Sequence, residues 1–239
     1  MPVDPTMRLE RSLYSGGVRY VIGCDEVGRG ALAGPVAVGM TVVDARVGVF
    51  PTGLRDSKLL SESRREQLAP RCAAWVLHWA VGMSSAAEVD ALGLTACLGL
   101  AGGRALAQLR QQGAPVEAST VLLDGSFDWL SPAVPTAPKV LTRVKADRDC
   151  GSVAAASVIA KVYRDRLMIS RDAATPGYGW AANKGYATAG HFAAIAARGA
   201  TDFHRRTWLK TLSGPERGSL CEPILVPVPA GVVGLTGID

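Results

Sequence analysis

The segment VIGCDEVGRGALAGPV, from Val21 to Val36, constrains the fold more than any other part of the chain. Its apolar run ends in two adjacent carboxylates, Asp25 and Glu26, and a glycine-rich stretch follows. A second apolar run, GPVAVGMTVVD, begins directly after the glycines, so the pattern predicts two neighbouring strands joined by a turn. The G-x-G-x-x-x-G spacing also fits a dinucleotide-binding loop, but in such a loop the glycines open a helix. The strand after the glycines weakens that alternative.

The rest of the chain alternates helices and strands. A third strand is predicted over residues 75–85, and shorter strands over 119–126 and 139–147. Helices are predicted over 61–73, 85–94, 95–113, 151–170, 189–199 and 200–210, the first with Ser61 as its N-cap. Strands interleaved with helices after an initial meander are typical of an α/β fold, in which helices cover a mixed sheet.

The predicted helix over residues 151–170 is apolar around most of its circumference, which indicates a largely buried position. Its remaining polar residues follow each other at four- and three-residue spacing: Ser157, Lys161 and Arg164. Residues at this spacing share one side of a helix. We therefore expect these three side chains to lie along one narrow stripe.

The chain has 239 residues, of which 48% are hydrophobic and 20% charged, a composition typical of one globular domain. We expect this domain over residues 18–212, after a flexible leader over 1–17. A Pro- and Gly-rich tail over 213–239 interrupts every periodic pattern. No apolar stretch reaches the ~18 residues of a membrane helix, and the polar N-terminus lacks the core of a signal peptide. From these features we expect a cytoplasmic protein.

Charge and cysteine content narrow the class of protein further. The net charge of +5 and a sequence pI of about 9.1 are compatible with a polyanionic partner, because lysine and arginine displace counterions from phosphates. The five cysteines are scattered, and no two have the spacing of a zinc site or a disulfide framework. We expect free, buried thiols at Cys24, Cys72, Cys97, Cys150 and Cys221.

Carboxylates end three of the predicted strands: Asp25 with Glu26, then Asp124, then Asp147. Each acid alone is more often a turn residue or a surface charge. Side chains at the ends of neighbouring strands can nevertheless converge, and four converging carboxylates would repel each other unless a cation neutralised them. Oxygen ligands without histidine or cysteine favour Mg²⁺ or Mn²⁺, and paired ions of this kind hydrolyse phosphodiesters. A divalent-metal site is the resulting hypothesis.

Five blocks occur in a fixed order: GCDEVGRGALAGPVAV, LRDSKLLSE, VLLDGS, KADRDCGSVAAASVIAKVYRD and NKGYAT followed by a histidine. Together they resemble bacterial ribonuclease HII, the type 2 ribonuclease H, from Tyr20 to Trp208. The resemblance implies a ribonuclease-H-like fold, a mixed sheet flanked by helices, with a small helical C-terminal region. It also implies an endonuclease that hydrolyses the RNA strand of RNA–DNA hybrids and cuts 5′ of single ribonucleotides embedded in duplex DNA.

The resemblance also implies roles for individual residues. Two Mg²⁺ or Mn²⁺ ions would be held by four catalytic acids, and the products would carry 3′-hydroxyl and 5′-phosphate ends. The G-R-G motif and a tyrosine would contact the ribonucleotide, with Tyr178 as the alternative to Tyr186, and two lysines are candidate phosphate contacts. The acids are Asp25, Glu26, Asp124 and Asp147; the substrate-binding candidates are Gly28, Arg29, Gly30, Lys58, Lys184 and Tyr186. The expected partners are RNA–DNA hybrids and ribonucleotide-containing DNA, bound by a monomer with no membrane association.

Weaker expectations concern the C-terminal segment HRRTW. Arg205 and Arg206 are further candidate phosphate contacts, whereas His191 and His204 are expected to be structural. The chain departs from the common family pattern at Ala146, in place of glycine before an acid, at Leu59, in place of a second lysine, and at Ala31, in place of proline. None of these changes removes a catalytic group.

Three alternatives remain open at this stage. Another metal-dependent nuclease of the same fold, such as a junction resolvase or the type 3 enzyme, would share the acids but not D-E-x-G-R-G with a later N-K-G-Y. An NAD(P)-binding oxidoreductase would use the glycines, but two carboxylates would face its pyrophosphate. A non-catalytic nucleic-acid-binding module is favoured only by the basic charge.

Overall fold

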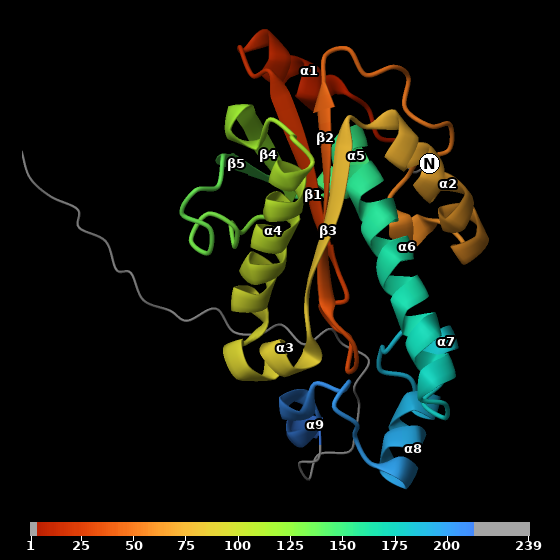
Figure 1. The fold of residues 1–239 in the computed structure, drawn as a ribbon. Coiled ribbons are helices and arrows are strands. Elements are labelled where there is room, and N and C mark those ends of the chain that lie inside the picture. Colours follow the sequence, from red (N-terminus) through yellow and green to blue (C-terminus); the bar gives the residue numbers. More distant parts are fainter. Residues whose placement is uncertain (1–3, 213–239) are drawn as a thin grey trace, which may run out of the picture.

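The computed structural model describes residues 4–212 and contains a five-stranded mixed sheet in the order β3-β2-β1-β4-β5. The pairs β1–β2 and β2–β3 are antiparallel, whereas β1–β4 and β4–β5 are parallel. Helices flank this sheet, so the predicted α/β class is confirmed (Figure 1). The strands are β1 (Tyr20–Val27), β2 (Val36–Asp44), β3 (His78–Ser84), β4 (Ser119–Asp124) and β5 (Lys139–Arg143).

Several helices begin where the sequence places a capping side chain. The Ser61 hydroxyl accepts a hydrogen bond from the Arg64 amide at the start of α2, and Ser85 forms a reciprocal capping box with Glu88 at the start of α3. The helices are α1 (Arg8–Ser15), α2 (Glu62–Trp75), α3 (Ala86–Leu92), α4 (Leu94–Gln111), α5 (Ala146–Asp149), α6 (Gly151–Ala174), α7 (Trp180–Asn183), α8 (Ala189–Arg198) and α9 (Arg206–Leu212), with 3₁₀ turns η1 (Ser57–Leu59) and η2 (Val116–Ala118).

The helices α4 and α6 cover opposite faces of the sheet (Figure 1). Glycines on the strands allow both helices to approach the sheet backbone closely. A Cβ atom added to Gly39 would lie 2.6 Å from the Ala156 carbonyl oxygen of α6, and one added to Gly82 would meet the backbone of α4. The two resulting apolar cores lie on either side of the sheet, and α6 is buried along most of its length as expected.

The N-terminal segment is not the flexible leader that the sequence predicted. Residues 8–15 form α1, in which Glu10 is fully buried. The Glu10 Oε1 atom accepts hydrogen bonds from the amide and the hydroxyl of Ser152, at 3.0 and 2.7 Å, in the first turn of α6. A carboxylate at this position satisfies free amides and interacts favourably with the helix dipole. The helix α1 is therefore part of the packed domain, while the predicted tail lies outside the described residues.

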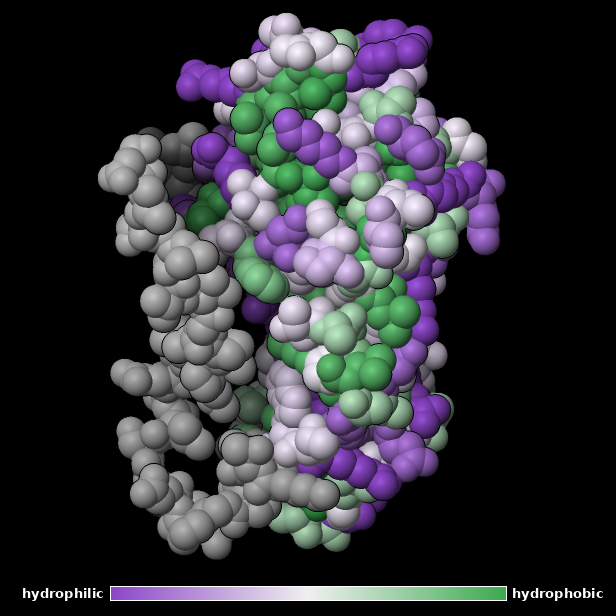
Figure 2. Space-filling model, turned by 90° about the vertical axis from the view of Figure 1, so that its left-hand side faces the viewer, coloured by the Kyte–Doolittle hydropathy of each residue, from purple (hydrophilic) through white to green (hydrophobic). Residues whose placement is uncertain are grey.

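Hydrophobic residues reach the surface in patches interrupted by hydrophilic ones (Figure 2). Such patches are ordinary on a folded protein. No helix within residues 4–212 is long and apolar enough to cross a membrane. The cysteines in this range are free and buried, as predicted, at Cys24, Cys72, Cys97 and Cys150, whereas Cys221 lies outside the described residues.

Candidate active site

Acidic residues meet at one edge of the sheet. The last paired residues of the parallel strands β1 and β4 are Cys24 and Leu123, so Asp25 and Asp124 follow them side by side. The backbone amide of Asp147 donates a hydrogen bond of 3.4 Å to the Asp124 Oδ1 atom. The structure thus brings Asp25, Asp124 and Asp147 together, although they lie far apart in sequence.

Two details of the strand-end prediction are wrong. The strand β1 does not end at the acids but continues to Val27, paired with β2, so Asp25 and Glu26 alternate between the two faces of the sheet. Asp147 does not end a strand, because β5 stops at Arg143 and Asp147 lies in the short helix α5. Lys145, immediately before α5, has the left-handed backbone conformation, with φ of 62°.

The D-S-K segment, residues 56–58, lies at the start of η1 next to the acids. The Lys58 Nζ atom lies 3.8 Å from the Asp147 Oδ2 atom, which supports the place of Lys58 beside the site. Asp56 accepts a hydrogen bond from the Lys58 amide at 2.9 Å, and its carboxylate lies close enough to Asp147 to raise the pKa of that side chain. The Ser157 hydroxyl, on α6, donates to the Ser57 hydroxyl at 2.8 Å, and Ser157 also lies close enough to Asp25 to influence the pKa of its carboxyl.

Asp56 and Ser157 lie beside the acids, and the sequence analysis assigned neither of them to the site. The signal for Asp56 was its place in the block LRDSKLLSE, where only the lysine was considered. Ser157 belongs to the polar stripe on α6. Its position near Asp25 explains why a polar residue occurs on this otherwise apolar part of the helix. Asp56 adds a fifth carboxyl to the group.

Burial and the charges of neighbouring acids disfavour ionisation of Asp25 and Asp147. Burial, followed by the charge of Glu26, raises the pKa of Asp25 well above its usual value, and the nearby Ser157 side chain only partly opposes this rise. Burial, followed by the charges of Asp124 and Asp56, raises the pKa of Asp147 to about 6. Burial acts to lower the pKa of Lys58, but the charges of the nearby acids, Asp25 first, outweigh this effect. The pKa of Lys58 is therefore raised.

The donor set fits a hard divalent cation. The ligand atoms available are carboxylate oxygens, and the Glu26 Oε2 atom is buried without a hydrogen-bond partner. Within residues 4–212 no three acidic, histidine or cysteine side chains already have the spacing of a metal site. Instead, Glu26 pairs with Arg29 at 2.7 Å, and Lys58 lies beside Asp147. Two cationic side chains thus supply part of the positive charge that the acids require.

The raised pKa of Asp147 predicts how the stability of the metal-free protein depends on pH. An aspartate in the unfolded chain titrates near a pKa of about 3.9, whereas Asp147 in the folded protein titrates at about 6. The folded state therefore binds more protons between these values, and the free energy of unfolding falls as the pH rises from about 4 to about 6. Asp147→Asn should flatten this fall. Thermal unfolding in EDTA at several pH values measures it, and an unchanged slope in the variant would contradict the assignment.

The G-R-G segment lies against the C-terminal region. Gly28 has a φ of +83°, and Ala31 pairs with Tyr186 in an isolated bridge. Arg205 is fully buried and donates to the carbonyl oxygens of Gly28 and Arg29, so the prediction of a phosphate contact for Arg205 is wrong.

The neighbouring basic residue, Arg206, is exposed and pairs with Asp202 at 2.6 Å. The histidines have the structural roles expected of them. His191 and His204 are buried, with their Nε2 atoms 3.2 Å apart, and His191 also accepts a hydrogen bond from the indole of Trp180.

The two candidate tyrosines differ in environment. Tyr178 is buried, stacks on Trp180 and donates its hydroxyl hydrogen to the Gly199 carbonyl at 2.8 Å. Tyr186 is only half-buried and lies next to the G-R-G segment. This placement favours Tyr186 as the residue that reaches substrate. Lys184 is buried with its ammonium 3.2 Å from the Glu62 carboxylate, which argues against a phosphate contact for Lys184.

A mixed sheet with acids at the adjoining ends of β1 and β4 defines a nuclease of the ribonuclease-H-like fold. The ribonuclease H2 from Pyrococcus horikoshii OT3 superimposes with a TM-score of 0.63 at 25% identity, over 79% of this chain and 93% of that one. A Bst-RNase HIII in complex with Mn²⁺ shares the fold, with a TM-score of 0.61 at 24% identity, over 82% of this chain and 68% of that one.

Sequence comparison resolves the family within this class. Residues 22–211 match the family model described as Ribonuclease HII. The ribonuclease HII of Streptomyces avermitilis is 46% identical over 87% of this chain and 85% of its own length. A ribonuclease HII of Thermus thermophilus is 42% identical over 87% of this chain and 95% of its own length. The chain belongs to the ribonuclease HII family and is an endoribonuclease acting on RNA–DNA hybrids.

Proposed function

We propose that the enzyme cuts the RNA strand of RNA–DNA hybrids and also cuts 5′ of a single ribonucleotide embedded in duplex DNA, leaving 3′-hydroxyl and 5′-phosphate ends. The observation that carries this proposal is the contact between two parts of the site. The acids at the ends of β1 and β4 are continuous, through the end of β1, with the G-R-G segment and Tyr186. Groups for hydrolysis and groups for reading a ribose therefore occupy one surface.

Each part of the chain has a distinct task in this proposal. Asp25, Glu26, Asp124 and Asp147 would hold two divalent cations, which supply an acidified water and neutralise charge on the leaving oxygen. Lys58 keeps its proton beside the acids and offers a positive charge to a phosphate. The G-R-G segment approaches the ribose through its backbone, and a 2′-hydroxyl is the group by which a protein distinguishes RNA from DNA.

The test uses a DNA duplex that carries one ribonucleotide and a matched duplex without it. We expect cleavage 5′ of the ribonucleotide with Mg²⁺ or Mn²⁺, no cleavage with EDTA, and no cleavage of the all-DNA duplex. End-labelling of the products identifies the 3′-hydroxyl and 5′-phosphate. Cleavage of a full RNA–DNA hybrid without cleavage of the single-ribonucleotide duplex would limit the activity to hybrids.

Further properties belong to the same proposal. We propose that α1 and residues 18–212 form one catalytic domain. We propose further that it acts as a monomer in the cytoplasm and removes ribonucleotides from DNA there. The absence of a membrane-spanning helix from residues 4–212 is compatible with this location. Sedimentation analysis of the purified chain, with and without duplex, checks the oligomeric state.

Tyr186 is predicted to contact the sugar or base at the ribonucleotide. Tyr186→Phe removes one hydroxyl and should reduce cleavage up to about tenfold, since a hydrogen bond contributes about 0.5–1.5 kcal/mol. Tyr186→Ala should reduce it further, because base–aromatic stacking contributes about 1–3 kcal/mol. Cleavage of the single-ribonucleotide duplex measures both effects, with Mn²⁺ affinity as the control. Wild-type cleavage by Tyr186→Ala would remove Tyr186 from the site.

A further inference from the structure

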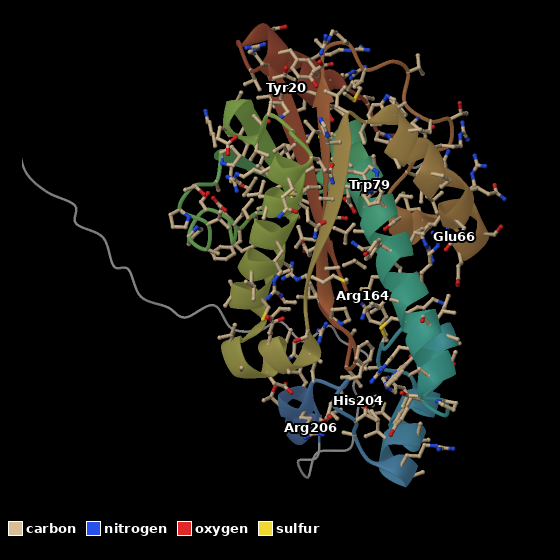
Figure 3. The ribbon with its side chains drawn as sticks, in the orientation of Figure 1. Tyr20, Glu66, Trp79, Arg164, His204 and Arg206 are labelled. Carbon is tan, nitrogen blue, oxygen red and sulfur yellow. The ribbon has the colours of Figure 1, made fainter. Side chains whose placement is uncertain are left out.

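Two arginines are fully buried beneath the G-R-G segment: Arg164 on α6 and Arg205 just before α9. Arg164 lies at the same end of the sheet as the C-terminal region that contains His204 (Figure 3). Neither guanidinium forms an ion pair within residues 4–212; Asp165, on the same helix as Arg164, pairs with Arg65 and Lys161 instead. A buried charge without a countercharge is costly, so these arginines require an explanation.

The Arg205 guanidinium donates only to backbone carbonyl oxygens of the turn between β1 and β2. Its Nη2 atom lies 2.6 Å from the Gly28 oxygen and 3.2 Å from the Gly34 oxygen, and its Nη1 atom lies 2.7 Å from the Arg29 oxygen. The planar fork of an arginine holds several acceptors in a fixed geometry, which a lysine ammonium does not. Arg205 thus fixes the orientation of successive peptide groups in the G-R-G motif.

Arg164 holds the other side of the same turn. Its Nε atom donates to the Pro35 oxygen at 2.8 Å and its Nη2 atom to the Ala33 oxygen at 3.1 Å. Its Nη1 atom donates to the Lys184 oxygen at 2.9 Å, and its guanidinium carbon lies 5.5 Å from the centre of the Tyr186 ring. Arg164 therefore connects the turn with the segment that carries the candidate substrate tyrosine.

The inward carbonyls determine where the amides point. In a trans peptide the N–H and C=O groups point in opposite directions, and no peptide bond among the described residues is cis. Because the Gly28 and Arg29 oxygens face the buried Arg205, the amides of Arg29 and Gly30 face away from it. Neither amide has an acceptor in the described part of the chain. A Cβ added to Gly30 would have no neighbour within 4 Å, so the space in front of these amides is open.

We propose that Arg205, supported by Arg164, is a positioning residue for ribose recognition, which holds the amides of Arg29 and Gly30 outward as a pair of donors to the 2′-hydroxyl oxygen. This inference rests on the proposed cleavage at single ribonucleotides. Neither arginine touches the substrate; both act through the backbone of the turn. Burial, followed by the charge of Arg164, lowers the pKa of Arg205 to about 9, so the fork remains charged near neutral pH.

Arg205→Lys separates geometry from charge, because it keeps the positive charge and removes the fork. The assay measures KM and kcat on the single-ribonucleotide duplex and the inhibition constant Ki of the matched all-DNA duplex. We expect KM to rise about tenfold, a change equivalent to one lost hydrogen bond, while Ki stays within about twofold of wild type. The control is Arg166→Lys, also on α6 but exposed and paired with Glu66, in which the ratio of Ki to KM should not change.

Several results separate the possible explanations. If wild type does not cleave the single-ribonucleotide duplex, the proposed function fails before the inference is tested. If wild type cleaves it but binds both duplexes equally, the inference is overturned. A folded Arg205→Lys enzyme with an unchanged ratio of Ki to KM overturns the inference, and so does an equal loss of affinity for both duplexes, which indicates a general structural role. If Arg205→Lys does not fold, Trp208→Leu replaces it, because the Trp208 ring lies 4.9 Å from the Arg205 guanidinium carbon. An unchanged ratio in that variant overturns the inference equally.

Discussion

Asp124→Asn should reduce cleavage of an RNA–DNA hybrid more than about 100-fold, since even an outer partner of a metal ligand typically contributes 10–100-fold. The amide keeps the size of the side chain but loses the charge that would hold a cation between β1 and β4. Removing one carboxylate from a repelling group should leave the fold intact and raise the melting temperature in EDTA. Cleavage rates with Mg²⁺ and melting curves with and without metal measure both effects.

Asp149→Asn is the matched control for this prediction. Asp149 lies in α5 close to the site in sequence, but it is exposed and pairs with Arg143 at 2.7 Å. Its replacement should leave cleavage close to wild type. Asp124 would lose its assignment as a metal-binding residue if the Asn variant cleaved at the wild-type rate.

The same substitution should affect the stability of the enzyme differently at the two glycines of the G-R-G motif. Gly28→Ala should destabilise the enzyme, because φ is +83° and the added methyl group would meet the Arg164 guanidinium. Strain of this kind costs about 1–3 kcal/mol, which corresponds to several degrees in melting temperature. Gly30→Ala adds the same methyl group where nothing lies within 4 Å, so it should melt like wild type.

Activity should separate the two variants further. The methyl group in Gly30→Ala would stand where the ribose approaches, and we expect cleavage of the single-ribonucleotide duplex to fall about tenfold or more. Thermal melting and cleavage are measured on both variants in parallel. A stable Gly30→Ala enzyme with full activity would show that the backbone there does not approach the substrate.

The secondary structure was largely predictable because its signals are local. Ser61 caps a helix where the sequence indicated one, and the parallel strands β1 and β4 place Asp25 and Asp124 side by side. Asp147 was misplaced because the apolar run KVLTRVKAD does not reveal the left-handed conformation of Lys145 that ends it. A side-chain pattern carries little information about such a backbone change.

Interactions between distant segments were not predictable from local patterns. The polar residues around Glu10 indicate a solvated leader. The hydrogen-bond donor that stabilises the buried Glu10 carboxylate is the Ser152 amide of α6, 142 residues away, which no local pattern reveals. Arg205 in HRRTW resembles an exposed phosphate ligand for the same reason, since the sequence does not show that carbonyl groups will surround it. Local composition therefore predicts solvent exposure for charged residues such as Glu10 and Arg205, which the structure shows to be buried.

The distance along the chain between Arg205 and Gly28 has a consequence for biosynthesis. These residues are 177 positions apart, yet they form one hydrogen-bonded unit. At a translation rate of about 5–20 residues per second, roughly 9 to 35 s separate their emergence from the ribosome. During that time the nascent chain carries its first acids but lacks the fork that fixes the turn after them. We therefore expect the chain to gain its preference for ribose only after the segment around Arg205 has emerged and folded against the turn.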